Sequence, residues 1–148
     1  MIKKLALTII FVLLVTRANA QKLVDTNPDG LYKNPNYTQV VRAGKLIFVA
    51  GQVGTNAGGK VIGPGMKEQY DQALSNLAIA LKSQGADLSN VATLTTYVTD
   101  MNAFREPDVL ALRLKRFSKH LPASTLVQVV RLADPAYKVE VEAVAVLP

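Results

Sequence analysis

Residues 122–148, PASTLVQVVRLADPAYKVEVEAVAVLP, contain the pattern that decides the fold. β-Branched residues are frequent in two runs, residues 124–131 and residues 138–147. A turn sequence around Asp134 and Pro135 separates these runs, and two strand-forming runs joined by a turn are typical of a β-hairpin. The stretch therefore predicts two strands that pair with each other.

The second of these runs changes its hydropathy pattern along its length. Glu140 and Glu142 first alternate with apolar residues, whereas Val144 and Val146 make the same face apolar further along. A strand that is apolar on both faces is usually covered on both faces. We therefore expect the two glutamates to lie where a solvent-filled cleft meets a buried layer.

The first 20 residues resemble a secretory signal peptide. A basic pair precedes an apolar run at residues 5–15, and residues 18–20 (ANA) form a small-x-small cleavage pattern. The run is short for a membrane span, which takes about 20 residues, although an uncleaved N-terminal anchor is the alternative. We expect export to the periplasm or the cell exterior, and cleavage to leave one domain at residues 21–148 without a membrane attachment.

Composition excludes several classes of site. The chain has no Cys and a single His, His120, so Cys nucleophiles and Cys/His zinc sites are excluded and no metal is expected. The formal charge of +6 falls by three to +3 when the basic residues of the leader are removed, and this modest charge argues against nucleic acid as a partner. Residues 54–60, GTNAGGK, match the start of a P-loop, but Val61 replaces the required Ser or Thr and no helix follows directly. We interpret this segment as a hairpin turn.

The rest of the pattern alternates strands with two helices. After an arm or lead-in at residues 21–36, we expect strands at residues 37–42 and 45–50, joined by a tight turn at Ala43 and Gly44. A helix at residues 66–84, a strand at residues 90–100, a turn that contains Asn102 and a helix from residue 106 onward follow. The apolar side chains expected to pack inward from the second helix are Val109, Leu110, Leu114 and Phe117.

This order predicts an α+β fold in which two helices cover one face of a sheet. Residues 46–49 and 144–147 are nevertheless apolar on both faces. A large apolar sheet face is seldom left in water, so the uncovered face predicts a homo-oligomer.

Seven short pieces of the chain occur, in the same order, in one known family. These pieces are residues 36–39, 48–52, 66–85, 95–100, 101–104, 121–123 and 139–143. On them, residues 34–147 resemble the RidA family, also called the YjgF or endoribonuclease L-PSP family. The resemblance implies a chorismate-mutase-like α+β fold with a mixed sheet, and a homotrimer with clefts at its subunit interfaces. It also implies hydrolysis of reactive enamines or imines of 2-oxo acids to the ketone and ammonia, without a metal or an organic cofactor.

The resemblance further implies roles for individual residues. The catalytic, water-positioning Glu of the family falls on Glu140, a residue type suited to proton transfer. Substrate-binding positions fall on the side chains of Tyr37 and Asn102 and on the backbone amide of Gly51. Without the resemblance, Glu140 and Glu142 are also compatible with two solvated glutamates, or with a glycosidase carboxylate pair, since their α-carbons are expected about 6.6 Å apart.

Some substrate-binding positions depart from the family pattern. In the family, the Arg that binds the substrate carboxylate directly follows Pro-Ala, and this chain has Ser124 there, followed by Thr125. Ala50 lies where the family has a Ser in the cleft. Arg holds a carboxylate through a bidentate, charge-assisted pair. Losing such a contact costs about 2–5 kcal/mol. Arg131 and Arg42 are candidate substitutes.

Three hypotheses follow. The chain is an exported hydrolase of a small enamine or imine, a non-catalytic protein that binds a small-molecule ligand in the same cleft, or a protein with the RNA-directed activity that one family name suggests. The modest charge argues against the third.

Overall fold

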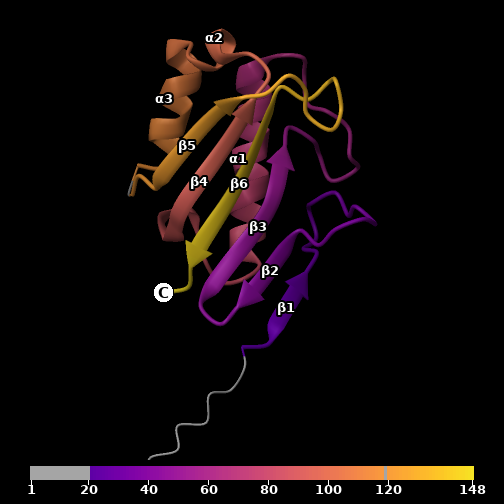
Figure 1. Cartoon of the computed structure of the whole chain (residues 1–148), viewed down its shortest axis with the longest axis vertical. Coiled ribbons are helices and arrows are strands. Elements are labelled where there is room, and N and C mark those ends of the chain that lie inside the picture. The colour runs from indigo at the N-terminus through magenta and orange to yellow at the C-terminus, as the bar shows by residue number, and fades with distance from the viewer. Residues whose placement is uncertain (1–20, 119) are drawn as a thin grey trace, which may run out of the picture.

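A mixed sheet with helices on one face organises residues 21–118 and 120–148, which the computed structural model describes (Figure 1). The strands are β1 Leu23–Thr26, β2 Val40–Ala43, β3 Leu46–Val53, β4 Val91–Val98, β5 Ala123–Gln128 and β6 Val139–Val146. The helices are α1 Met66–Lys82, α2 Met101–Phe104 and α3 Pro107–Arg116, and Leu88–Asn90 forms a 3₁₀ turn before β4. β1 occupies part of the segment that the sequence assigned to a lead-in. The predicted signal peptide at residues 1–20 lies outside the described residues.

The strand order is β1-β2-β3-β6-β4-β5. β6 lies in the middle, antiparallel to both β3 and β4, while β5 lies at the edge and runs parallel to β4. The predicted hairpin between residues 124–131 and residues 138–147 is therefore wrong. Strand propensity and turn residues are local signals that do not specify a partner, and β6, apolar on both faces at its end, takes a central position between two strands. A parallel pair needs a crossover connection, which α2 and α3 provide between β4 and β5.

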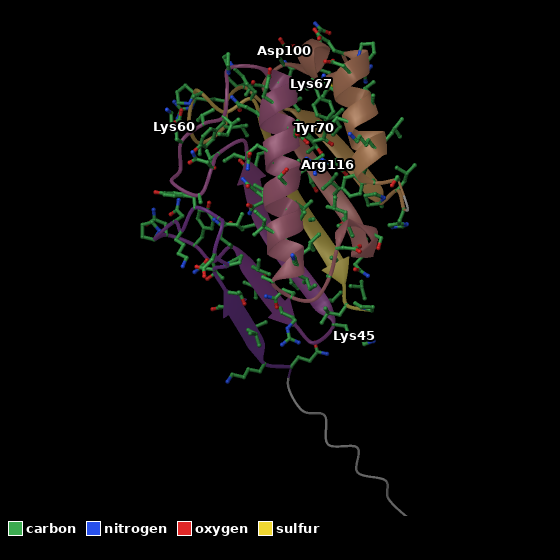
Figure 2. All side chains as sticks on the ribbon, turned by 180° about the vertical axis from the view of Figure 1, so that it is seen from behind. Lys45, Lys60, Lys67, Tyr70, Asp100 and Arg116 are labelled. Atoms are coloured by element: carbon green, nitrogen blue, oxygen red, sulfur yellow. The ribbon has the colours of Figure 1, made fainter. Side chains whose placement is uncertain are left out.

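The core lies between the sheet and α1. Tyr70, Leu74 and Leu77 are fully buried on one stripe of α1, as the helical spacing predicts. They belong to the same apolar cluster as Val139 and Val141, which are the buried positions of β6 that alternate with the glutamates. Burying each such side chain contributes about 1.5–3 kcal/mol. Seen from behind in Figure 2, α1 crosses the sheet, with Tyr70 on the side that faces α3.

The turns predicted at Gly44 and within residues 54–60 are confirmed. The turn between β2 and β3 uses Gly44 at a φ of 60°, a left-handed conformation that favours glycine. In the P-loop-like segment, Thr55 pairs with Val61, and the Asn56 amide donates to the Lys60 carbonyl at 2.9 Å. This segment is therefore a short hairpin and does not open a helix as a P-loop does.

One part of the expected packing of α3 is wrong. Val109 and Phe117 are buried as predicted, but Leu110 and Leu114 are 42% and 60% exposed. Leu110 and Leu114 lie on a stripe rotated by about 100° from the one that starts at Val109. The Val109 stripe faces α1: Arg116, near the end of this stripe, donates from Nε to Asp71 on α1 at 2.9 Å.

The sheet face opposite α1 carries exposed apolar side chains. Leu46, Phe48 and Val146 are 42%, 43% and 40% exposed, and Val144 beside them is partly buried. Figure 1 shows this face toward the viewer, with α1 behind the sheet. The uncovered apolar face expected from the sequence is thus present in the single chain, and the homotrimer stays a prediction.

Candidate active site

A cavity of about 340 Å³ opens where β3 ends and β6 begins. Its lining includes Tyr32 and Tyr37 from the loop between β1 and β2, Gly51 from β3, Tyr137 from the loop before β6, and Glu140 from β6. Figure 1 shows both loops beside the end of β3. The central pairing of β6 with β3 therefore brings together residues that are far apart in the sequence.

A β-bulge in β3 shapes one wall of this cavity. Val49 pairs with Ala143 but Gln52 pairs with Val141, so β3 contains one residue more than β6 in this interval. The extra residue belongs to the Ala50–Gly51 step. A Cβ built on Gly51 would lie 1.8 Å from Oε1 of Glu140, so the glutamate carboxylate lies directly against the Gly51 backbone. Only glycine leaves room for the carboxylate at this position.

Two buried amides fix the loop against β3. Gln52 donates from Nε2 to Oε1 of Gln39 at 2.7 Å and to the Ala50 carbonyl at 2.9 Å. Gln39 in turn donates from Nε2 to the Tyr32 carbonyl at 2.7 Å. Since both amides are almost fully buried, breaking these bonds would leave polar groups without partners. The network therefore holds Tyr32 at the cavity.

The acidic groups that line the cavity have pKa values raised above their ordinary values. Burial raises the pKa of Glu140, and the negative charge of Glu142 adds to the rise. Burial also raises the pKa of Tyr37, against a hydrogen bond with Gln39 that lowers it, and the charge of Glu140 contributes further. Among the described residues that line the cavity there is no Lys, Arg or His. Glu140 is thus a half-buried carboxyl group without a cationic partner in this lining.

Comparison with known proteins identifies the family. The profile of the Endoribonuclease L-PSP family matches residues 30–147. The chain belongs to this family, the RidA family.

Individual relatives agree with the RidA assignment. A mouse protein named 2-iminobutanoate/2-iminopropanoate deaminase is 37% identical over 111 residues, which cover 74% of this chain and 80% of the mouse protein. The human protein of the same name is 32% identical over 111 residues, covering 74% and 79%. The solved structure of RidA from an Antarctic Psychrobacter species matches with a TM-score of 0.75 at 22% identity, covering 83% of this chain and 98% of that one. The expected RidA/YjgF fold is confirmed.

Three of the RidA positions predicted from the sequence lie together. Tyr37, Gly51 and Glu140 all line the cavity, although the resemblance alone assigned them. Their roles in binding and catalysis stay predictions, and their common location makes them testable as one site.

The other three predicted positions lie elsewhere in the single chain. Asn102 is exposed on the short helix α2, where the sequence suggested a turn. Ser124 and Thr125 lie on the edge strand β5, opposite Leu94 and Thr95 of β4. Because β4 and β6 separate β5 from β3, one chain does not bring these residues to the cavity.

Neither candidate substitute for the missing Arg lines the cavity. Arg131 borders a different hollow together with Asp100 and Lys138. Arg42 lies on β2, opposite Ile47 of β3.

The two glutamates of β6 have different surroundings. Glu142 is exposed and accepts a hydrogen bond from the Tyr97 hydroxyl at 3.1 Å, and it does not line the cavity. Glu140 alone reaches into it. This difference disfavours a glycosidase-type pair, in which both carboxylates flank one bond.

Several cavity residues were missed from the sequence. Tyr32 and Tyr137 lie in loops that carry no periodic pattern, and Gln39 and Gln52 read as ordinary strand residues. Asn76 was missed as well: it lies on the buried side of α1 and donates from Nδ2 to the carbonyls of Val53 and Thr55 at 3.0 and 2.9 Å. An amide inside an apolar run was the available signal, because buried amides require partners.

Within residues 21–118 and 120–148, no group of three His, Cys, Asp or Glu side chains is arranged to hold a metal ion. No helix in the same part of the chain is long and apolar enough to cross a membrane.

Proposed function

We propose that this RidA protein hydrolyses a small reactive imine or enamine, with Glu140 as the residue that transfers protons. The observation that carries the proposal is the Glu140 carboxylate held against Gly51 inside a cavity. Relatives that are named 2-iminobutanoate/2-iminopropanoate deaminases support this class of reaction.

The proposed reaction consumes one water. The Glu140 carboxylate accepts a proton from the water while the water oxygen attacks the imine carbon, and the carboxyl group returns that proton to the nitrogen. The resulting carbinolamine passes its hydroxyl proton to the nitrogen through the same carboxylate, the C–N bond breaks, and ammonia and the ketone are released. Because burial raises the pKa of Glu140, the group is better able to donate a proton as well as accept one.

The proposal includes assembly. We propose a homotrimer in which the apolar sheet face of one copy is covered by another, and in which the catalytic cleft lies at each interface. The exposure of Leu46, Phe48 and Val146 supports this arrangement. Asn102 and Ser124 would then complete the cavity of a neighbouring copy, since they lie away from the cavity of their own.

The proposal also includes export. Residues 1–20 would act as a signal peptide and be removed after Ala20, as their basic start, apolar run and small-x-small end suggest. The mass of the protein recovered from the periplasm or medium tests this step, because retention of residues 1–20 would contradict it.

Ammonia release tests the enzymatic proposal. The substrate would be an imine generated in place by an amino-acid oxidase or an amine oxidase, and the rate would be compared with the spontaneous rate. We expect acceleration by the native protein, loss of it in Glu140→Gln, and no loss in the matched control Glu106→Gln, whose carboxylate lies on the surface at the start of α3. The proposal would be refuted if the native protein did not accelerate the hydrolysis of any imine produced by either oxidase.

A specific observation also favours a non-catalytic ligand-binding protein. The described residues that line the cavity include no cationic side chain, and Ser124 replaces the family Arg, so this lining offers no charged partner for a carboxylated imine. Ser124→Arg separates the alternatives: a gain of ammonia release from a 2-imino acid in this variant alone would indicate an intact cleft whose natural ligand differs.

A further inference from the structure

Tyrosines are concentrated at the cavity. The chain has five tyrosines, and Tyr32, Tyr37 and Tyr137 all line this one cavity. The other two lie in the core between α1 and α3 and on the open sheet face. The three rings come from two loops, so the folded chain, rather than sequence proximity, brings them together.

The three phenols and the carboxylate are close enough to influence one another. The pKa of Tyr137 is raised first by burial, then by the charge of Asp134, and then by Tyr37, Tyr32 and Glu140. The backbone of Gly59 in the short hairpin packs closely against the Tyr32 ring, since a Cβ added to Gly59 would lie 2.9 Å from Cδ2 of the ring. Rings and carboxylate therefore form one group around a shared space.

The charges of this group have one sign. The lining contains one carboxylate, several neutral amides and phenols, and no cationic side chain among the described residues. A carboxylate-bearing ligand would bring a second negative charge next to Glu140 without compensation, and like charges in a partly desolvated site repel strongly. A cation is attracted both by the carboxylate and by the electron-rich faces of aromatic rings.

We propose that the cavity selects an organic cation without a carboxylate, such as a protonated imine or an alkylammonium ion, through Glu140 and the rings of Tyr32, Tyr37 and Tyr137. This inference rests on the proposed function in that it names the substrate class of the same site. The protonated imine is also the form most readily attacked by water, and its nitrogen already carries the proton that a neutral imine takes up during the attack. With this form, the Glu140 carboxylate accepts a proton from the attacking water, passes it to the nitrogen, and accepts the hydroxyl proton as the C–N bond breaks and ammonia leaves.

A binding titration with matched probes tests the selection. The cationic probe is choline, and its neutral counterpart is 3,3-dimethylbutan-1-ol, which has the same shape with carbon in place of nitrogen. Glycine betaine and 2-oxobutanoate serve as the carboxylated probes. Calorimetry or ligand-observed NMR on the purified protein should show choline binding at least about tenfold more tightly than the other three.

Variants assign the selection to the cavity. Tyr37→Leu should weaken choline binding by about 2- to 30-fold, the range expected for one ring, while Tyr37→Phe, which keeps the ring, should retain most of it. Glu140→Gln should abolish the preference for choline over its neutral counterpart, and Glu106→Gln on α3 should preserve it. Equal binding of the cation and the neutral probe, tighter binding of a carboxylated probe, or no binding of choline would each overturn the inference.

The outcomes distinguish this inference from the enzymatic proposal. Selective choline binding without acceleration of any imine hydrolysis would refute the enzyme and leave the cation site standing. An amino-acid oxidase supplies imines that carry a carboxylate, and an amine oxidase supplies imines without one. Faster hydrolysis of the carboxylated imines would support the enzyme and refute the cation site.

Discussion

The contact between Gly51 and Glu140 supports a sharp prediction for Gly51→Ala. The added Cβ would lie 1.8 Å from Oε1 and 2.6 Å from Cδ of Glu140, whereas ordinary van der Waals contact begins at 3.4 Å. The carboxylate must therefore retreat by about 1.6 Å, the difference between 3.4 and 1.8 Å. A displacement of about 1 Å in a reacting group can cost on the order of 100-fold in rate.

We expect Gly51→Ala to lower imine hydrolysis by about 100-fold while changing the free energy of unfolding by less than about 1 kcal/mol. The fold tolerates the change because Gly51 does not adopt a positive φ and the atoms in conflict lie at the end of a flexible, half-buried side chain. Replacing Gly by Ala also reduces the entropy of the unfolded chain, which offsets part of the strain. The measurement combines ammonia release with thermal unfolding.

Two companion variants make the result interpretable. Gly58→Ala is the matched control, because its Cβ would meet only the Asn56 side chain, at 3.4 Å. In the Gly51→Ala background, Glu140→Asp shortens the acid by one methylene and should restore part of the lost rate. A Gly51→Ala protein that folds normally and hydrolyses at the native rate would refute the reasoning, because the carboxylate would then not act from its position against Gly51.

Three further predictions concern titration and packing. Glu142→Gln should lower the pKa of Glu140, because it removes a repelling charge, and ¹³C NMR of the Glu140 carboxyl group measures the change. Burial raises the pKa of Glu140 in the folded protein above its value in the unfolded chain, so the folded state holds the proton more tightly. Stability is therefore lost as the pH rises from the unfolded pKa through the folded pKa. Glu140→Gln should remove this loss, so its melting temperature relative to the native protein should be higher at about pH 8 than at about pH 4. Leu77→Ala in the core should lower the free energy of unfolding by about 2–5 kcal/mol. Leu114→Ala on the exposed side of α3 should change it by less than about 0.5 kcal/mol, and chemical denaturation measures both variants.

The elements that are decided by local pattern could be predicted from the sequence. α1 and the turn at Gly44 follow from helical spacing and a glycine requirement, and the structure has both. The partner of β6 could not be predicted, because strand propensity is a property of one segment whereas pairing depends on the whole sheet. The apolar end of β6 contained the relevant signal, since a strand apolar on both faces suits the centre of a sheet better than a hairpin at its edge.

The site could be predicted only where a resemblance supplied the residues. Tyr37, Gly51 and Glu140 lie together, but no rule of spacing would have joined a loop residue, a strand glycine and a glutamate about 90 positions further along the chain. Tyr32 and Tyr137 were missed because loop residues have no periodicity and their common location depends on the long-range pairing of β3 with β6.

The open sheet face and the cavity are linked through β6, and this link makes the homotrimer testable at the site itself. Glu140 and Val144 point to the same side of β6, and Val144 lies opposite Phe48 of β3 on the exposed apolar face. Covering that face with a second copy would remove water from the neighbourhood of Glu140 and so raise the pKa of its carboxyl group further. Phe48→Lys would introduce an unpaired charge into such an interface, which is costly to bury.

We therefore expect Phe48→Lys to reduce the mass measured by sedimentation to that of a single chain and, at the same time, to lower the Glu140 pKa measured by ¹³C NMR. Leu114→Lys, which changes an exposed apolar residue on α3, should alter neither quantity. A Phe48→Lys protein with native mass would show that this face does not associate. A dissociated protein with an unchanged Glu140 pKa would show that the cavity is complete in one chain, and Asn102 and Ser124 would then have no part in it.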